Sequence, residues 1–232
     1  MALALVQSTK KVVTAVNNTT LAYASNVTAA NLLCVTHTHY SNPSQLITTP
    51  VDTLTHTYTG MAAEQSIVFG ADATKLRSFY VANCSGGANT VTFDIASTTT
   101  GDITCVIAEF SGVATTTPLE TTNTGTATDT AVSGGSVTPA ANGALLWGGM
   151  TFDGATTTIT EAMTIVQENE AGSTSMPVGC EWKEQAVAAA EAATWTLGAS
   201  RQYLAHTACF TAAAGGAATP VRLRRLSLLG VS

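Results

Sequence analysis

The sequence is a series of short apolar runs rich in β-branched residues, and clusters of Gly, Asn, Pro, Ser and Asp separate these runs. Such spacing is typical of antiparallel strands joined by turns. Threonine accounts for 42 of the 232 residues, and its β-branched side chain suits a pleated surface that meets water. We therefore expect an all-β fold, a two-sheet antiparallel sandwich with N- and C-terminal arms. The expected strands are 10–16, 19–24, 31–40, 54–60, 66–70, 76–83, 90–96, 103–111, 127–138, 143–152, 158–168, 175–186, 192–198 and 203–212.

Apolar and polar residues alternate within several runs, which places every second side chain on the same face of a strand. Ala193, Trp195 and Leu197, for example, alternate with Thr194 and Thr196. We expect the apolar members of such runs to form the core. The expected core residues are Ala193, Trp195, Leu197, Val91, Phe93, Ile95, Phe79, Val81, Ile103, Cys105, Ile107, Leu145 and Phe210.

Two segments could interrupt this scheme. Residues 181–195 are rich in Ala and Glu, which favour a helix by intrinsic propensity. The flanking runs favour strands, and a helix of that length gains little without an apolar face, so we expect a strand, a turn and a strand. Residues 121–143 are rich in turn formers. We interpret them as a loop with one strand inside, because neither half of the chain alone holds enough alternating strands to close a sandwich.

The chain is therefore expected to form a single domain overall. Residues 1–29 would supply an N-terminal arm and the first strands, 30–212 the β-sandwich, and 213–232 a C-terminal arm. Both ends contain apolar residues where a monomer usually frays. An arm that docks on a neighbouring subunit would explain this character, and so would packing against the chain's own body.

Charge and cysteine content narrow the class of partner. The formal net charge of −6 argues against a nucleic-acid surface, because phosphates require a clustered positive field. The apolar start precedes the first basic residues, the reverse of the order in a signal peptide, and no apolar run is long enough to span a membrane.

The five cysteines contain no C-x-x-C pair, and Cys34, Cys105 and Cys209 lie in apolar runs. We expect reduced core thiols in a protein that folds in a cytoplasm.

The histidines of "THTHY" are candidate metal ligands. His37 and His39 would share a strand face with Cα atoms roughly 6.6 Å apart. His56 would be a third ligand if 54–60 paired with 31–40, leaving the open position that a catalytic zinc site requires. The alternative is that His37 and His39 are hydrogen-bonded or solvated residues near the end of a strand. We favour this alternative and predict no metal or other cofactor.

Glu109 is the most promising candidate for a catalytic carboxylate. It follows alternate apolar residues of one strand, and burial there would raise its pKa as a general acid requires. A glycosidase would need a second carboxylate, for which Glu168 and Glu170 are available. Nothing in the sequence brings either near Glu109. We therefore favour a capping role, in which Glu109 accepts N–H bonds from the following "SGV" turn.

Five segments share the spacing and residue types of a known kind of domain: "YVANCSGGANTVTFDI" (80–95), "CVIAEFSGVATTTPLE" (105–120), "SVTPAANGALLWGGM" (136–150), "AATWTLGAS" (192–200) and "HTACF" (206–210). Together they resemble a Thr/Gly-rich β-sandwich domain common in uncharacterised tailed-phage virion proteins and bacterial surface proteins. The resemblance covers roughly residues 30–212 and brings no catalytic residues. It implies a structural or adhesive module with a jelly-roll or immunoglobulin-like topology. Because no export signal is predicted, the phage branch fits better than the surface-protein branch.

The expected function is that of a non-enzymatic virion structural protein of a tailed bacteriophage, a capsid decoration or other exterior protein. Its partners would be copies of itself and other capsid or virion proteins, together with a host surface glycan, and neither nucleic acid nor a membrane. Two alternatives remain, a carbohydrate-binding module that uses Trp182, and a zinc- or carboxylate-dependent hydrolase. The residues expected to contact a partner are Arg222, Leu223, Arg224, Arg225, Leu226, Leu228 and Leu229.

Overall fold

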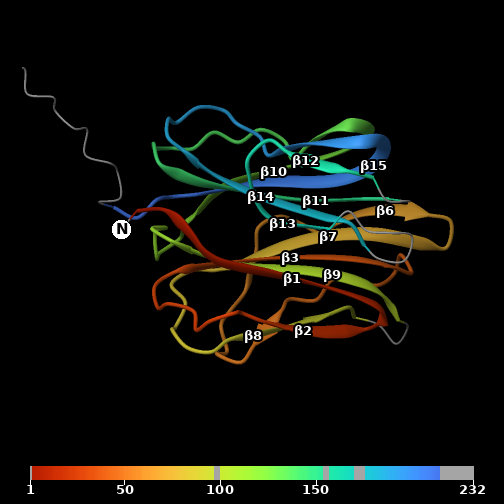
Figure 1. The fold of residues 1–232 in the computed structure, drawn as a ribbon, viewed down its shortest axis with the longest axis horizontal. Coiled ribbons are helices and arrows are strands. Elements are labelled where there is room, and N and C mark those ends of the chain that lie inside the picture. Colours follow the sequence, from red (N-terminus) through yellow and green to blue (C-terminus); the bar gives the residue numbers. More distant parts are fainter. Residues whose placement is uncertain (1, 97–99, 154–156, 170–175, 215–232) are drawn as a thin grey trace, which may run out of the picture.

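The fold consists of β-sheets. The computed structural model describes residues 2–96, 100–153, 157–169 and 176–214, and every regular element in these ranges is a strand. The strands pair antiparallel in three sheets that lie one above another (Figure 1). The expected all-β antiparallel sandwich is therefore confirmed, with a third sheet added to the two expected. The strands are β1 (Ala4–Val16), β2 (Asn18–Ala22), β3 (Leu32–Ser41), β4 (Val51–Asp52), β5 (Thr59–Gly60), β6 (Gln65–Phe69), β7 (Asp72–Val81), β8 (Thr90–Asp94), β9 (Gly101–Ser111), β10 (Leu119–Ser133), β11 (Ala144–Phe152), β12 (Ile159–Glu161), β13 (Thr164–Asn169), β14 (Val178–Gln185) and β15 (Thr194–Phe210).

The middle sheet has the order β1-β9-β3-β7-β5, and β6 also pairs with β7. The small sheet β2-β8-β4 covers one of its faces, and the sheet β10-β15-β11-β14-β13 covers the other. Because both faces are covered, β3 and β9 are buried along almost their whole length. Strands buried on both sides need apolar residues at consecutive positions. This explains why "NLLCV" and "ITCVIAEF" do not alternate.

Alternate residues of β3 belong to different core layers. Leu33 and Val35 belong to a cluster with Phe93 of β8, between the middle sheet and the small sheet. Cys34 belongs to a second cluster with Trp147 of β11, between the middle sheet and the large outer sheet. Full burial of one such aliphatic or aromatic side chain contributes about 1.5–3 kcal/mol. The middle sheet therefore joins both layers into one body.

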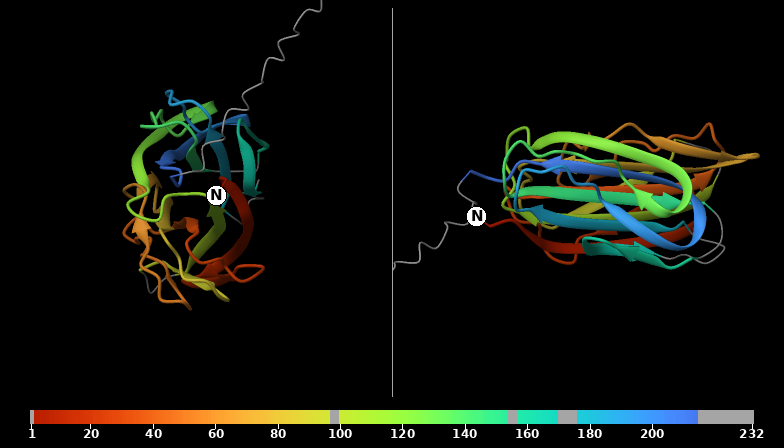
Figure 2. Two further views of the ribbon diagram at one scale, coloured as in Figure 1. Left: turned by 90° about the vertical axis from the view of Figure 1, so that its left-hand side faces the viewer. Right: turned by 90° about the horizontal axis from the view of Figure 1, so that it is seen from above.

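The outer sheet contains a long ribbon of β10 and β15 that changes direction. The pairing register shifts next to Asp129, and both strands curve at the end of the molecule away from the N-terminus (Figure 2). The ribbon returns so close to its own sheet that side chains would collide. A Cβ on Gly125 would lie 1.9 Å from the carbonyl oxygen of Ser133, and one on Gly148 would lie 2.3 Å from the Cβ of Ala193. Glycine is therefore required at both positions.

The core and the turn predictions agree with the structure. Every residue expected in the core is buried, including Trp195 at 2% exposure, and all five cysteines are free and buried. In the segment 181–195, β14 ends at Gln185 and β15 begins at Thr194, so strand, turn and strand is confirmed. Within 121–143, one strand is present, but β10 begins earlier than expected, at Leu119, and ends at Ser133.

The N-terminal segment belongs to the sandwich. The first strand was expected at 10–16, whereas β1 pairs with β9 from Ala4, opposite Ser111, to Val16, opposite Gly101. Most of its residues are partly or fully exposed, because β1 is the edge strand of the middle sheet. Much of the expected N-terminal arm is thus an edge strand held by backbone hydrogen bonds.

Candidate functional site

The structure separates the three candidate metal ligands. The strands that flank β3 are β7 and β9, and β5 pairs with β7 instead of β3. Residues 54–60 therefore do not pair with 31–40, as a third ligand would require. His37 and His39 are buried with ring centroids 5.9 Å apart, while His56 hydrogen-bonds to Asp52 and Ser85. Among the described residues, no three His, Cys, Asp or Glu side chains are arranged to hold a metal ion.

Burial keeps the two adjacent histidines neutral. Removal from water lowers the pKa of His37 well below its usual value, and the neighbouring His39 lowers it further. Burial also lowers the pKa of His39 to about 4. The ring of His37 packs edge-on against Phe93, with centroids 5.5 Å apart. These histidines are therefore parts of the core and do not lie at a solvated strand end.

Glu109 has a structural role, although not with the expected partners. Its carboxylate accepts hydrogen bonds from Gln7 Nε2 at 2.6 Å, from the Thr28 N–H at 2.8 Å and from Asn31 Nδ2 at 2.5 Å. The donors thus come from β1 and from the turn before β3, and the expected "SGV" turn supplies none of these three. With these bonds, the fully buried carboxylate is held by neighbouring polar groups.

The candidate partner carboxylate has different neighbours. Glu168 lies beside Glu161, and burial together with a hydrogen bond to Glu168 raises the pKa of Glu161 to about 8. Glu161 thus holds its proton more tightly than a solvated glutamate does. Glu170 lies outside the described residues. The pairing of Glu109 with "QENE" that a glycosidase would require therefore gains no support.

Trp182, the residue that a carbohydrate-binding module would use, is half-buried, whereas Trp147 and Trp195 are buried. Its ring packs edge-on against Phe110 with centroids 5.4 Å apart. Its indole nitrogen is buried and has no hydrogen-bond partner within the described ranges. Part of the ring that would stack on a sugar is thus occupied by the core. The seven residues expected to contact a partner, Arg222, Leu223, Arg224, Arg225, Leu226, Leu228 and Leu229, lie outside the described residues.

Both described chain ends lie at one end of the sandwich (Figure 1). Ala2 approaches Gly112, where a Cβ would lie 2.5 Å from the Ala2 carbonyl oxygen, and the φ of Gly112 is +77°. The Ala213 N–H donates to the Gly112 carbonyl oxygen at 2.8 Å, and Val113 forms a bridge with Ala212. Ala212 and Ala213 therefore lie on the body beside the N-terminal residues.

A pocket of about 430 Å³ lies at the opposite end of the middle sheet. Its lining includes Tyr40, Asp72 and Asp102. The hydroxyl of Tyr40 donates to Asp72 Oδ2 at 3.1 Å, and Asp102 Oδ1 accepts the Ala15 N–H at 3.1 Å. Tyr40 is one of the exposed large apolar side chains, at 37%. An exposed aromatic ring therefore lies beside two carboxylates.

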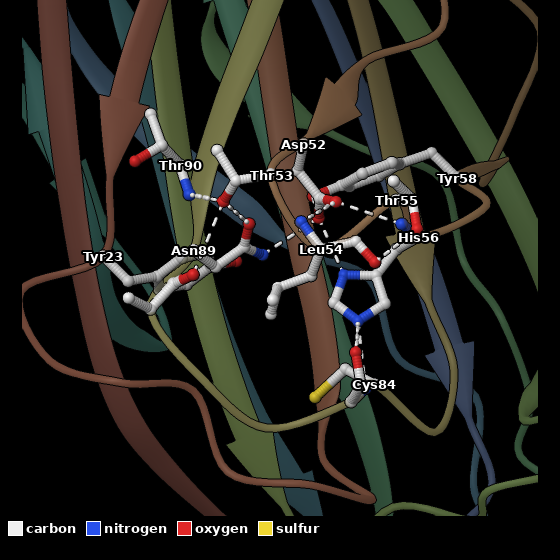
Figure 3. Close-up of polar contacts among 12 residues, drawn as sticks. Tyr23, Asp52, Thr53, Leu54, Thr55, His56, Tyr58, Cys84, Asn89 and Thr90 are labelled. Atoms are coloured by element: carbon white, nitrogen blue, oxygen red, sulfur yellow. Dashed lines mark hydrogen bonds and ion pairs between the residues drawn. The ribbon is translucent and has the colours of Figure 1, made fainter.

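The end of β4 and the loop after it form a further polar site, which is centred on Asp52 (Figure 3). Asp52 Oδ1 accepts the N–H of Leu54 at 3.1 Å and the N–H of His56 at 3.0 Å. Such bonds from an aspartate to the following backbone are typical of a turn. The turn brings the His56 ring back to the same carboxylate, with Nδ1 2.7 Å from Asp52 Oδ2.

Further donors keep the Asp52 carboxylate ionised. Oδ2 accepts the Tyr58 hydroxyl at 3.0 Å and Asn89 Nδ2 at 2.9 Å. Burial raises the pKa of Asp52, but the bonds from Asn89, His56 and Tyr58 outweigh this effect and leave the pKa below its usual value. The side chain of Asp52 is fully buried, and that of His56 is 8% exposed. A buried anion thus orients a nearly buried imidazole.

The other side of the imidazole faces Ser85. His56 Nε2 lies 2.8 Å from Ser85 Oγ and accepts the Ser85 N–H at 2.9 Å. Because a backbone N–H can only donate, Nε2 must carry the lone pair, and the ring proton therefore lies on Nδ1, toward Asp52. Ser85 itself is exposed. The arrangement directs the basic nitrogen of a neutral histidine at an exposed hydroxyl.

Sequence reasoning missed this cluster because its parts lie far apart in the chain. "DTLTH" and "NCSGG" match no catalytic motif, and only the pairing of β4 with β8 and of β5 with β7 brings them together. The spacing of Asp52 and His56 was the one available signal.

No family model matches the chain, and neither a curated protein nor a solved structure shows significant similarity to it. Within the ranges that the structure describes, no helix is long and apolar enough to cross a membrane.

Proposed function

We propose that this protein is a virion structural protein of a tailed bacteriophage, a capsid decoration or other exterior protein that joins subunits through its C-terminal segment. The observation that carries the proposal is the position of the chain ends. The segment after Thr211 begins beside Ala2, at one narrow end of the sandwich. That segment continues with the apolar and basic residues of "VRLRRLSLLGVS".

The composition of this segment suits a docking role. Leucines at 223, 226, 228 and 229 offer apolar area, and each leucine that a neighbour buries contributes about 1.5–3 kcal/mol before ordering costs. The arginines at 222, 224 and 225 suit an acidic partner surface, and the net charge of −6 makes another copy of this chain such a partner.

Deletion of 220–232 tests the proposal. We expect the full chain to associate and the truncated chain to remain a monomer in light scattering, because losing only two buried leucines weakens association by roughly 100-fold or more. Replacing Leu223, Leu226 and Leu229 by serine should have the same effect. The matched replacement of the three arginines by serine should weaken association by a smaller factor, and mainly at low salt, because salt screens charge interactions. A truncated chain that assembles as well as the full chain contradicts the proposal.

A second candidate function, glycan binding, is favoured by the pocket at the end opposite the chain termini. Tyr40 supplies an aromatic face, and Asp72 and Asp102 supply acceptors for sugar hydroxyls. A protein anchored by one end would present this pocket outward. A glycan array should then show binding that Tyr40→Ala weakens by roughly tenfold, more than Trp182→Ala does. Equal loss in both variants, or binding unaffected by Tyr40→Ala, would remove the pocket from consideration.

A further inference from the structure

We propose that Ser85 is a nucleophile that cleaves carboxylic esters with short acyl groups, with His56 as its general base and Asp52 as a positioning residue. This activity goes beyond the assembly role and does not depend on it. It also departs from the expectation of a purely non-enzymatic protein. The cluster lies in the loops beside the small sheet, and it includes no residue of the C-terminal segment.

The proton path is continuous in the resting structure. The Ser85 hydroxyl lies 2.8 Å from His56 Nε2, and His56 Nδ1 lies 2.7 Å from Asp52 Oδ2. Both distances fall in the range that a nucleophile and its base require. The N–H of Ser85 fixes the tautomer in which Nε2 can accept a proton. The same connectivity of hydroxyl, imidazole and buried carboxylate recurs on unrelated folds and is recognised by geometry instead of sequence order.

The reaction uses only these groups and water. Ser85 Oγ attacks the ester carbonyl carbon as its proton passes to His56 Nε2. The tetrahedral intermediate collapses with cleavage of the bond to the alkoxide, which leaves with the proton from Nε2. Water then attacks the acyl-serine, gives its proton to Nε2, and releases the carboxylic acid as that proton returns to Ser85 Oγ. Throughout, Asp52 stabilises the imidazolium without taking a proton.

The backbone next to the nucleophile offers donors to the intermediate. The Ser85 N–H bonds to His56 Nε2 in the resting structure, so it can donate to an oxyanion only if that bond breaks when Nε2 takes up the proton. Gly86 supplies the next N–H along the chain. A backbone N–H that bonds to the oxyanion would stabilise the developing charge.

The surroundings of Ser85 indicate the substrate class. Gly87 has no side chain to obstruct an approaching carbonyl, whereas the Cβ position of Gly86 faces the backbone of Val27 and Ala29 at 3.3 and 3.2 Å. The methyl groups of Leu54 lie 3.6 and 3.9 Å from where a Cβ on Gly87 would be, which provides one small apolar contact. A short acyl group such as acetyl fits this exposed setting, whereas a long chain would extend into solvent.

Covalent labelling tests the nucleophile without a known substrate. We expect a fluorophosphonate probe to add once to the full chain, at Ser85 by peptide mapping. In Ser85→Ala this adduct should be absent, and any remaining labelling of the chain should be slower by roughly 100-fold or more. Ser44→Ala is the matched control, because Ser44 is also an exposed turn serine but its hydroxyl bonds to Asn42 instead of an imidazole. Equal labelling of wild type and Ser85→Ala, or an adduct elsewhere, overturns the proposal.

Turnover of p-nitrophenyl acetate tests the roles of the other two residues. We expect Ser85→Ala and His56→Gln to fall to the rate of buffer, and Asp52→Asn to lower kcat by roughly 100-fold with little change in KM. Thermal unfolding identifies any variant that fails to fold, and Ser85→Ala removes only one surface hydroxyl. Light scattering on Ser85→Ala should match wild type, which separates this result from the fate of the assembly proposal. Wild-type turnover equal to that of Ser85→Ala contradicts the inference.

Discussion

Buried titratable side chains in this protein are either neutral or ionised, and His37, His39 and Asp52 show both cases. The two histidines have no protein hydrogen-bond partner for their ring nitrogens within the described ranges, so burial keeps them neutral by lowering their pKa values. Asp52 is surrounded by donors from Leu54, His56, Tyr58 and Asn89 and keeps its charge. The core therefore tolerates polar groups either by neutralising them or by bonding them fully.

These pKa shifts predict a stability maximum near pH 6.5. Burial lowers the pKa of His37, His39 and His206, the last two to about 4, so the unfolded chain binds more protons below 6.5 and stability falls with decreasing pH. Burial raises the pKa of Glu181 to about 7 and that of Glu161 to about 8. Because an unfolded glutamate ionises near 4.5, the folded chain binds more protons between that pH and about 8. The stability that these two groups contribute is therefore lost as the pH rises through 7 and 8.

Urea unfolding at pH 4.5, 6.5 and 8.5 measures this profile. We expect the free energy of unfolding to be highest at pH 6.5 and lower on both sides, by on the order of 1–2 kcal/mol because solvent screens the half-buried Glu161. In Glu181→Gln the decline above pH 6.5 should be smaller. A stability that keeps rising to pH 8.5 in the wild type would show that these carboxyl groups are ionised in the folded protein.

At the scale of elements, the ribbon of β10 and β15 is the least ordinary part of the sandwich. Its strands leave the sheet, reverse direction and return over the same sheet, so main chains meet where a side chain would normally separate them. Trp195 illustrates the result, since it belongs to β15 yet lies above Gly148 of the neighbouring strand β11. The packing of this ribbon depends on glycine at the points of contact.

Gly125→Ala should therefore destabilise the protein. The new Cβ would lie 1.9 Å from the Ser133 carbonyl oxygen, and overpacking of this kind costs about 1–3 kcal/mol. Gly60→Ala is the matched control, because its Cβ would meet the nearest atom, the Ala62 carbonyl oxygen, at an ordinary 3.5 Å. Urea unfolding at one pH compares the two variants. Equal stability of Gly125→Ala and wild type would mean that the ribbon does not lie on the sheet as described.

At the scale of the whole molecule, the sequence predicts the class of fold better than the arrangement of its layers. Alternation identified Phe93 and Trp195 as core residues correctly, because a strand with one solvated face keeps its period of two. It could not show that β3 is covered on both faces. The position of His56 could not be predicted for the same reason, since the order of strands in a sheet depends on long-range pairing. The cluster of Asp52, His56 and Ser85 was missed for that reason as well.

The most direct test of the central claim is the mass of the purified full chain by light scattering over a range of concentrations. We predict an oligomer with a mass that is a multiple of the 23.7 kDa chain mass. It should dissociate only on strong dilution, when the leucines of the C-terminal segment no longer contact a neighbouring copy. A mass of 23.7 kDa at every concentration would contradict the proposal that the C-terminal segment joins copies of this chain.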